Sequence, residues 1–180
     1  MPTIILDRDG LINQDSDEYI KSPREWQAIP GSLEAIKKLN DAGYDVCIAT
    51  NQSGLGRGLF SIQTLDQIHQ KMINELEAMG GVIRMIVYCP HHPDAKCACR
   101  KPNTGLLTTI NEEFRLNSDT SWMVGDTAKD VECAHRMGIR GALVRTGKGE
   151  SELRKGVVSR ETTPIFDDLA EFVAWLLSRV

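Results

Sequence analysis

The chain has 180 residues, of which 41% are hydrophobic and 26% are charged, a composition typical of a soluble globular protein. No hydrophobic run approaches the ~20 residues that cross a membrane, and Asp7 interrupts the N-terminus before a signal-peptide core could form. The net charge of −4 argues against nucleic-acid binding, which depends on basic surface. We therefore expect a single cytoplasmic domain over residues 1–180, with neither a nucleic-acid nor a membrane partner.

Strands and helices are predicted to alternate along the chain. Short hydrophobic runs predict strands at residues 3–6, 44–50, 82–88, 122–124 and 142–144. Hydrophobic residues at helical spacing, with Ser61 as one N-cap and Gly43 as one C′ residue, predict helices at 30–42, 61–79, from about 104, 128–137 and 166–177. Strands separated by helices indicate a doubly wound α/β sandwich with a parallel sheet.

Acidic side chains follow two of the predicted strands. Asp7 and Asp9 come directly after the first strand, and Asp126 follows the strand at 122–124. Because the carboxyl ends of parallel strands meet at one edge of the sheet, we expect these carboxylates to converge. Carboxylates brought together repel one another and need a cation, and Mg²⁺ prefers oxygen ligands together with phosphate. The pattern therefore indicates magnesium-dependent phosphoryl transfer, in which one aspartate attacks phosphorus and another handles a proton.

Two further segments supply groups that hold phosphate. The residues from Thr50 to Gly54, at the end of the second strand, offer a hydroxyl and several backbone N–H groups. Arg100 and Lys101 place two cations ahead of a predicted helix, where a lysine point charge and a bidentate arginine suit phosphate oxygens. In an acidic chain, such a local positive field favours an anionic substrate.

A cluster of cysteine and histidine predicts a structural zinc site. Cys89, His91, Cys97 and Cys99 form a Cys₃His set within one short polar loop. Four such ligands leave no open position, as in closed tetrahedral zinc sites. His92 is the alternative fourth ligand.

Together these segments resemble the motifs of the haloacid dehalogenase (HAD) superfamily of phosphatases. The matching segments are L-D-R-D-G at 6–10, T-N-Q-S at 50–53, Lys101, and G-D-T-A-K-D at 125–130. The added C-P-H-H-P and C-x-C-R-K-P segments make the chain similar to the heptose bisphosphate phosphatases, with the histidinol-phosphate phosphatases as the alternative. The resemblance spans residues 3–149.

The resemblance implies a HAD-like fold with a minimal cap, in which residues 89–103 form a zinc-binding loop. It also implies a monomer that removes the 7-phosphate of a heptose bisphosphate, a small sugar phosphate used in lipopolysaccharide and surface-glycan precursor synthesis. Asp7 would be the nucleophile, and Asp9 the acid and then the base. Thr50 and Lys101 would hold the phosphoryl group, while Asp7, the Asp9 carbonyl and Asp126 would hold Mg²⁺. The expected substrate contacts are Arg8, Asp15, Ser16, Asp17, Glu18, Asn51, Gln52, Ser53 and Arg100.

Two positions depart from the family pattern. Leu11 stands where the first motif usually ends in threonine, and Thr127 stands where heptose phosphatases often have lysine. A competing interpretation is a zinc-organised binding module without activity. The intact set of catalytic aspartates, Thr50 and Lys101 argues against that interpretation.

Overall fold

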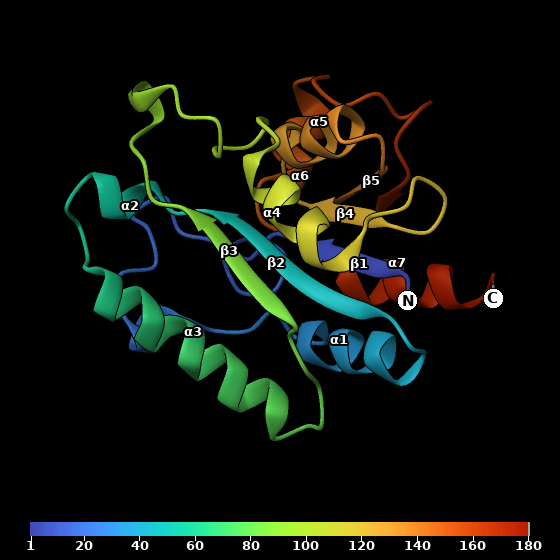
Figure 1. Ribbon diagram of the computed structural model, residues 1–180, viewed down its shortest axis with the longest axis horizontal. Coiled ribbons are helices and arrows are strands. Elements are labelled where there is room, and N and C mark those ends of the chain that lie inside the picture. The colour runs from blue at the N-terminus through green and yellow to red at the C-terminus, as the bar shows by residue number, and fades with distance from the viewer. Residues whose placement is uncertain (180) are drawn as a thin grey trace.

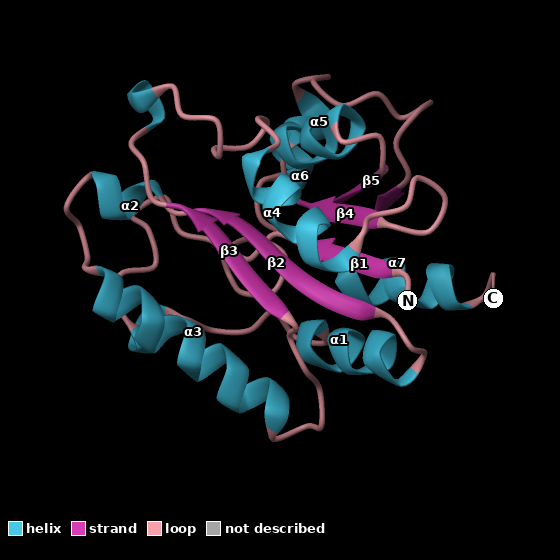
Figure 2. Ribbon diagram, viewed as in Figure 1, coloured by secondary structure: helices cyan, strands magenta, loops and turns pink. Residues whose placement is uncertain are grey.

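The computed structural model describes residues 1–179, in which six parallel strands form one sheet between layers of helices (Figures 1 and 2). The strands are β1 (Thr3–Leu6), β2 (Asp45–Asn51), β3 (Met85–Cys89), β4 (Trp122–Gly125), β5 (Arg140–Val144) and β6 (Ile165–Phe166). The helices are α1 (Ser32–Asp41), α2 (Ser53–Gly56), α3 (Ile62–Glu77), α4 (Gly105–Phe114), α5 (Ala128–Arg136), α6 (Gly149–Arg154) and α7 (Leu169–Leu177), with 3₁₀ helices η1 (Pro23–Glu25) and η2 (Pro93–Ala95). The predicted doubly wound α/β sandwich is confirmed.

The order of the strands determines where a ligand can bind. The strand order in the sheet is β3-β2-β1-β4-β5-β6. Strands β2 and β3 therefore lie on one side of β1, and the later strands β4, β5 and β6 lie on its other side, so the strand order reverses at β1. In open α/β sheets, ligands bind beyond the carboxyl ends of the strands at this reversal. Asp7 follows β1 and Asp126 follows β4. Both carboxylates therefore lie at the reversal point.

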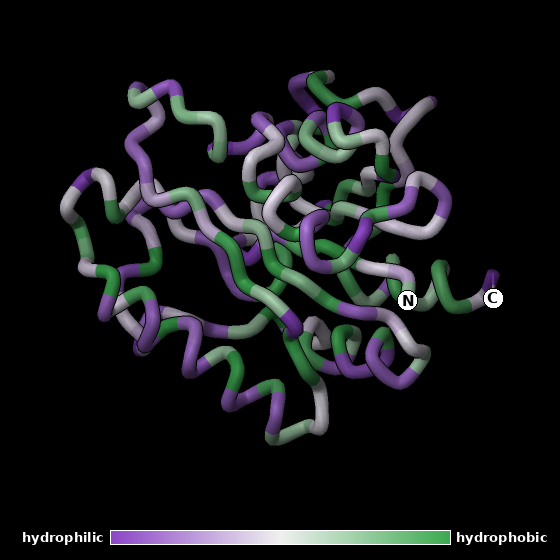
Figure 3. The backbone as a smooth tube through the Cα atoms, in the orientation of Figure 1, coloured by the Kyte–Doolittle hydropathy of each residue, from purple (hydrophilic) through white to green (hydrophobic). Residues whose placement is uncertain are grey.

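Alternate residues of the central strands pack against opposite helical layers. Ile4 and Leu6 are buried in a core with α1, α3 and α7, whereas Ile5 is buried against α4 and α5. This two-sided burial explains the nearly continuous hydrophobic strands of the sequence. Figure 3 shows the hydrophobic strands enclosed by helices whose hydrophobic and hydrophilic residues alternate.

The helix-end signals of the sequence are confirmed at two positions. The Ser61 hydroxyl accepts a hydrogen bond from the Thr64 backbone N–H at 3.1 Å and begins α3. Gly43 follows the C-terminus of α1 with a φ of +83°, a conformation that glycine adopts without steric penalty.

The structure differs from the predicted elements at several places: α2, α6 and β6 were not predicted, β5 begins at Arg140 rather than at residue 142, and other boundaries shift. The third strand begins at Met85 rather than at residue 82, because the backbone N–H of Val82 bonds the Asn40 side chain instead of a neighbouring strand. The closing helix begins at Leu169, since Phe166 belongs to the short strand β6. No helix within residues 1–179 is both long and apolar enough to span a bilayer.

Candidate active site and zinc loop

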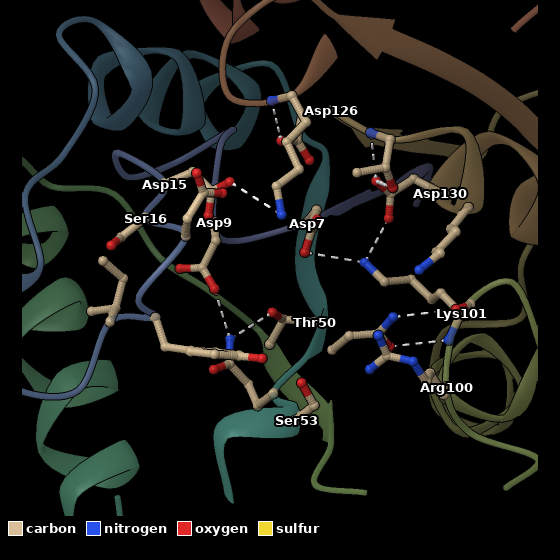
Figure 4. Close-up of a pocket in the computed structure, with 18 residues that line it drawn as sticks. Asp7, Asp9, Asp15, Ser16, Thr50, Ser53, Arg100, Lys101, Asp126 and Asp130 are labelled. Atoms are coloured by element: carbon tan, nitrogen blue, oxygen red, sulfur yellow. Dashed lines mark hydrogen bonds and ion pairs between the residues drawn. The ribbon is translucent and has the colours of Figure 1, made fainter. Parts of the chain in front are cut away.

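A polar pocket lies where the central strands end, and it collects side chains from distant parts of the chain (Figure 4). Asp7 comes from the end of β1, Thr50 from β2, and Asp126 from the residue after β4. Arg100 and Lys101 reach the pocket from the loop between β3 and α4. The sheet edge thus brings together the segments singled out in the sequence.

Three carboxylates form a cluster in the pocket. Oxygen atoms of Asp7, Asp126 and Asp130 all lie within 4.8 Å of one another. Burial, together with the charges of Asp7 and Asp130, raises the pKa of Asp126 from 3.8 to about 8. Burial also raises the pKa of Asp7 to about 7, although the charge of Lys101 opposes the rise. An all-oxygen cluster whose ionisation is this costly fits a divalent cation such as Mg²⁺.

The ammonium group of Lys101 lies beside the acidic cluster and is held by three oxygen atoms. Its Nζ lies 2.6 Å from Asp130 Oδ1, 3.1 Å from Asp7 Oδ1, and 2.7 Å from the Ala49 carbonyl oxygen. Burial favours the neutral amine, but the charges of Asp130 and Asp7 outweigh it and raise the pKa of Lys101. The ammonium group therefore stays charged at the centre of the site.

Both carboxylate oxygens of Asp130 are already paired, one with Thr127 and the other with Lys101. Its Oδ2 accepts hydrogen bonds from the backbone N–H and the hydroxyl of Thr127, which caps the N-terminus of α5. Its Oδ1 pairs with Lys101. Asp7 and Asp126 consequently remain the carboxylates with the most room for a cation.

Asp126 is held tightly by backbone. Its Oδ2 accepts the Lys148 backbone N–H at 2.8 Å. Two glycines in the left-handed region pack against the same oxygen, and a Cβ would lie 2.1 Å from it at Gly10 or 2.2 Å from it at Gly147. The close approach of these segments requires glycine at both positions and fixes the Asp126 carboxylate.

The carboxylate of Asp9 is not part of the acidic cluster and is surrounded by hydrogen-bond donors. Arg8 contacts both of its oxygens, Asn13 Nδ2 donates to Oδ1 at 2.9 Å, and Gln52 Nε2 donates to Oδ2 at 3.0 Å. Burial alone would raise the pKa of Asp9, but the charge of Arg8 and these hydrogen bonds hold it below its ordinary value. Asp9 therefore has a different environment from Asp7, only two residues away.

The segment after β2 connects these groups. Gln52 Nε2 donates to Thr50 Oγ1 at 2.9 Å as well as to Asp9, so it links the two side chains. Asn51 binds the backbone of Lys101 twice, since its Oδ1 accepts the Lys101 N–H at 3.0 Å and its Nδ2 donates to the Lys101 carbonyl at 3.2 Å. This pair of bonds joins the end of β2 to the loop that carries Lys101.

Most of the predicted catalytic and substrate-contacting residues line the pocket. They are Asp7, Asp9, Asp15, Ser16, Asp17, Thr50, Asn51, Gln52, Ser53, Arg100, Lys101 and Asp126.

Two of the expected substrate contacts, Arg8 and Glu18, do not line this pocket. The Arg8 side chain is fully buried, and its guanidinium is used by Asp9 and His69 beneath the pocket. Glu18 is exposed outside the pocket lining, where its carbonyl accepts a hydrogen bond from Lys21.

Sequence reasoning did not assign several residues that also line the pocket. They are Tyr19, Ile20, Thr127, Lys129, Asp130 and Lys148. Lys148 follows β5, so its place after a parallel strand is the signal that could have revealed it. Of the two departures from the family pattern, Leu11 is buried in the core and Thr127 caps α5.

The cysteine and histidine residues of the loop after β3 converge as expected. The three sulfur atoms lie 3.2 to 3.5 Å apart, and His91 Nδ1 lies 3.2 Å from Cys99 Sγ and 3.6 Å from Cys89 Sγ. A tetrahedron with zinc–sulfur bonds of about 2.3 Å needs sulfurs roughly 3.8 Å apart, so the four atoms fit one Zn²⁺. His92 instead accepts a hydrogen bond from the Asp94 backbone, which favours His91 as the fourth ligand.

The zinc loop also contacts the segments that surround the pocket. Asn103 donates to the Cys97 carbonyl at 2.8 Å, and the Gly105 N–H donates to the Ala98 carbonyl at 3.0 Å. On the other side, a Cβ at Gly56 would lie only 2.5 Å from the His92 backbone nitrogen. The loop is therefore packed between α2 and the start of α4, with Arg100 and Lys101 between these contacts.

Comparison with known proteins gives full-length matches. A profile of the HAD-hydrolase-like family matches residues 98–172. The D-glycero-beta-D-manno-heptose-1,7-bisphosphate 7-phosphatase of Pseudomonas putida is 49% identical over 177 residues, which cover 98% of this chain and 100% of that protein. The protein of the same name from Bordetella bronchiseptica is 48% identical over 98% of each chain.

Solved structures agree with the sequence matches. The crystal structure of D,D-heptose 1,7-bisphosphate phosphatase from B. bronchiseptica, complexed with magnesium and phosphate, has a TM-score of 0.96 and 46% identity over the whole of both chains. The corresponding enzyme from Burkholderia thailandensis has a TM-score of 0.78 and 39% identity over 99% of both chains. The resemblance to HAD phosphatases is thus confirmed, and the chain belongs to the D-glycero-D-manno-heptose-1,7-bisphosphate 7-phosphatase family of HAD-like hydrolases.

Proposed function

We propose that this protein is a magnesium-dependent phosphatase that releases the 7-phosphate of D-glycero-beta-D-manno-heptose 1,7-bisphosphate. The observation that carries the proposal is the set of Asp7, Asp126 and Lys101 at the sheet reversal, in a chain that matches heptose bisphosphate phosphatases over its full length. The β anomer is proposed because the relatives from P. putida and B. bronchiseptica are named for it.

Asp7 and Asp126 would hold Mg²⁺, together with the backbone carbonyl of Asp9. Bound Mg²⁺ would neutralise the clustered carboxylates and the charge on the phosphoryl oxygens. The hydroxyl of Thr50 and the ammonium group of Lys101 would bind the same phosphoryl group from the protein side. The three N–H groups of Lys101 point at Asp130, Asp7 and the Ala49 carbonyl, so one of them would turn from Asp7 to a phosphoryl oxygen while the positive charge stays in place.

The reaction would proceed in two steps on this chain's own residues. In the first, a carboxylate oxygen of Asp7 would attack phosphorus and the bond to the sugar oxygen would break. Arg8 and the hydrogen bonds around Asp9 favour its ionised form, so Asp9 would take up a proton from solvent when the substrate binds and then give that proton to the departing oxygen. In the second, water attacks the aspartyl-phosphate, Asp9 takes a proton from the water, and inorganic phosphate leaves. Asp7 and Asp9 return to their starting states.

The rest of the substrate would lie against the remaining pocket residues. Arg100 suits an anionic part of the substrate, because its Nη1 is buried and has no hydrogen-bond partner among the described residues. On the opposite side, Asp15 and Ser16 suit sugar hydroxyl groups (Figure 4). Cys89, with the other three ligands of the loop, would bind a structural Zn²⁺ that holds Arg100 and Lys101 in place.

Phosphate release with and without Mg²⁺ tests the proposal directly. The substrates are both anomers of the heptose bisphosphate and histidinol phosphate, compared by kcat/KM. The β anomer should be preferred, and Asp7→Asn should abolish turnover while keeping the wild-type circular dichroism spectrum. A preference for histidinol phosphate would change the substrate but keep the mechanism. Metal-independent turnover, or an active Asp7→Asn variant, would overturn the mechanism.

A further inference from the structure

A buried histidine on α3, His69, contacts Arg8, the arginine that donates hydrogen bonds to the Asp9 carboxylate. His69 is only 6% exposed, and its Nε2 lies 3.1 Å from Nη1 of Arg8. Arg8 is completely buried, and its other nitrogen atoms bind Asp9: Nε and Nη2 contact Oδ1 at 3.0 and 2.8 Å, and Nη2 contacts Oδ2 at 3.0 Å. His69 therefore accounts for the part of the guanidinium that Asp9 leaves unpaired.

The chemistry of this contact defines the state of the histidine. A guanidinium group can only donate hydrogen bonds, so Nε2 of His69 must be the acceptor and the imidazole must be neutral with its proton on Nδ1. Burial, with the charge of Arg8, lowers the pKa of His69 to about 4, in agreement with a neutral ring. The neutral ring that this contact requires is therefore the form favoured at neutral pH.

The hydrogen bonds distinguish the two oxygens of Asp9. Oδ1 accepts from Arg8 Nε, Arg8 Nη2 and Asn13 Nδ2, so its acceptor positions are filled. Oδ2 accepts from Arg8 Nη2 and from Gln52 Nε2, which lies on the pocket side next to Thr50. The guanidinium of Arg8 and the side chain of Gln52 thus hold Oδ2 on the pocket side, and His69 contacts the remaining nitrogen of that guanidinium.

We propose that His69 is a positioning residue for Asp9, acting through the buried guanidinium of Arg8. This inference rests on the proposed role of Asp9 as the acid that protonates the departing oxygen. Without an acceptor at position 69, Nη1 of the buried Arg8 guanidinium loses its hydrogen-bond partner, and the guanidinium rotates toward another acceptor. Asp9 turns with the guanidinium, and Oδ2 no longer faces the oxygen that it must protonate.

Leaving-group dependence separates this role from a merely structural one. A sugar oxygen needs a proton to depart, whereas the phenolate of para-nitrophenyl phosphate leaves without one. Since kcat/KM reports the steps up to cleavage of the phosphorus–oxygen bond, misplacing the acid lowers it for the sugar substrate only. General acid catalysis contributes about 10²- to 10⁴-fold, so we expect His69→Leu to lose about tenfold or more on heptose bisphosphate and less than about threefold on para-nitrophenyl phosphate.

Three further variants complete the experiment. His69→Gln places a carbonyl oxygen near the position of Nε2 and should restore most of the lost activity. His69→Asn keeps a polar side chain that is too short to reach Arg8, and it should show the selective loss even if the leucine variant does not fold. Met72→Leu changes another buried residue of α3 while conserving volume, and it should leave the ratio of the two kcat/KM values unchanged.

Asp9→Asn is the reference that separates the two ideas. It should show a larger selective loss on heptose bisphosphate than any variant at position 69. If Asp9→Asn affects both substrates equally, the proposed role of Asp9 fails. If Asp9→Asn is selective, the role of Asp9 stands and the variants at position 69 decide the second idea. The inference about His69 is overturned if His69→Leu and His69→Asn affect both substrates equally or affect neither. It is also overturned if His69→Gln is no more active than His69→Asn.

Discussion

Replacing Asp126 by asparagine is expected to stabilise the metal-free protein and to abolish its stabilisation by magnesium. Asp126 is only 2% exposed, and burial with the charges of Asp7 and Asp130 raises its pKa from 3.8 to about 8. Asparagine keeps the shape and can still accept the Lys148 N–H, but it carries no charge. The substitution therefore removes electrostatic repulsion from the fold along with a magnesium ligand.

The expected magnitude follows from the raised pKa. Each pH unit between the ordinary and the raised pKa corresponds to about 1.4 kcal/mol, so ionised Asp126 costs the fold at most roughly 6 kcal/mol. Below about pH 4 the carboxyl group is protonated in both the folded and unfolded states, and no cost arises. As the pH rises toward 8, the unfolded state ionises first and the wild-type protein loses stability. The advantage of Asp126→Asn should grow over this range to about 2–5 kcal/mol.

Urea denaturation in the presence of a chelator, at pH 5 and at pH 8, measures this difference in the free energy of unfolding. Added Mg²⁺ should then stabilise the wild type, by about 2.7 kcal/mol at one hundred times its dissociation constant, and should leave Asp126→Asn unchanged. Asp119→Asn, which removes a charge from the exposed surface, is the control. The reasoning is refuted if Asp126→Asn is no more stable than the wild type at pH 8, or if its advantage is the same at both pH values.

Three other perturbations have definite expected outcomes. Gly10→Ala should lose most phosphatase activity, because its Cβ would displace the magnesium-binding carboxylate of Asp126. Gly43→Ala is the control and should stay active, because Gly43 has nearly the same φ but no atom within 4 Å of the added Cβ. Similar kinetics in the two variants would contradict this expectation. Removing zinc should speed amide exchange in residues 89–103 and lower kcat without changing the affinity for Mg²⁺, and full activity of the zinc-free protein would argue against the positioning role. Asn51→Ala should lower kcat about tenfold by freeing the backbone of Lys101 while zinc content stays the same; an unchanged kcat would show that this contact is dispensable.

The sequence predicted which segments would meet. Hydrophobic runs followed by Asp7, Thr50 and Asp126 predicted their convergence, because the carboxyl ends of parallel strands share one sheet edge. The zinc ligands were also predictable, since Cys89 and its three partners lie close together in the chain and need only a local turn to meet. These features depend on the direction of the strands and on short distances along the chain, and both can be inferred from the sequence.

Side-chain direction could be decided only by the tertiary structure. Arg8 looks like a pocket residue in sequence, but it turns inward because α3 presents a buried acceptor, His69, that is 61 residues away. Asn51 is likewise committed to the backbone of Lys101, 50 residues away. Strand β6 itself also escaped prediction, because a two-residue strand has too little periodicity to be distinguished from the start of a helix. Local pattern determined the sheet and its acidic edge, whereas hydrogen bonds between distant segments decided which polar side chains remain free for the substrate.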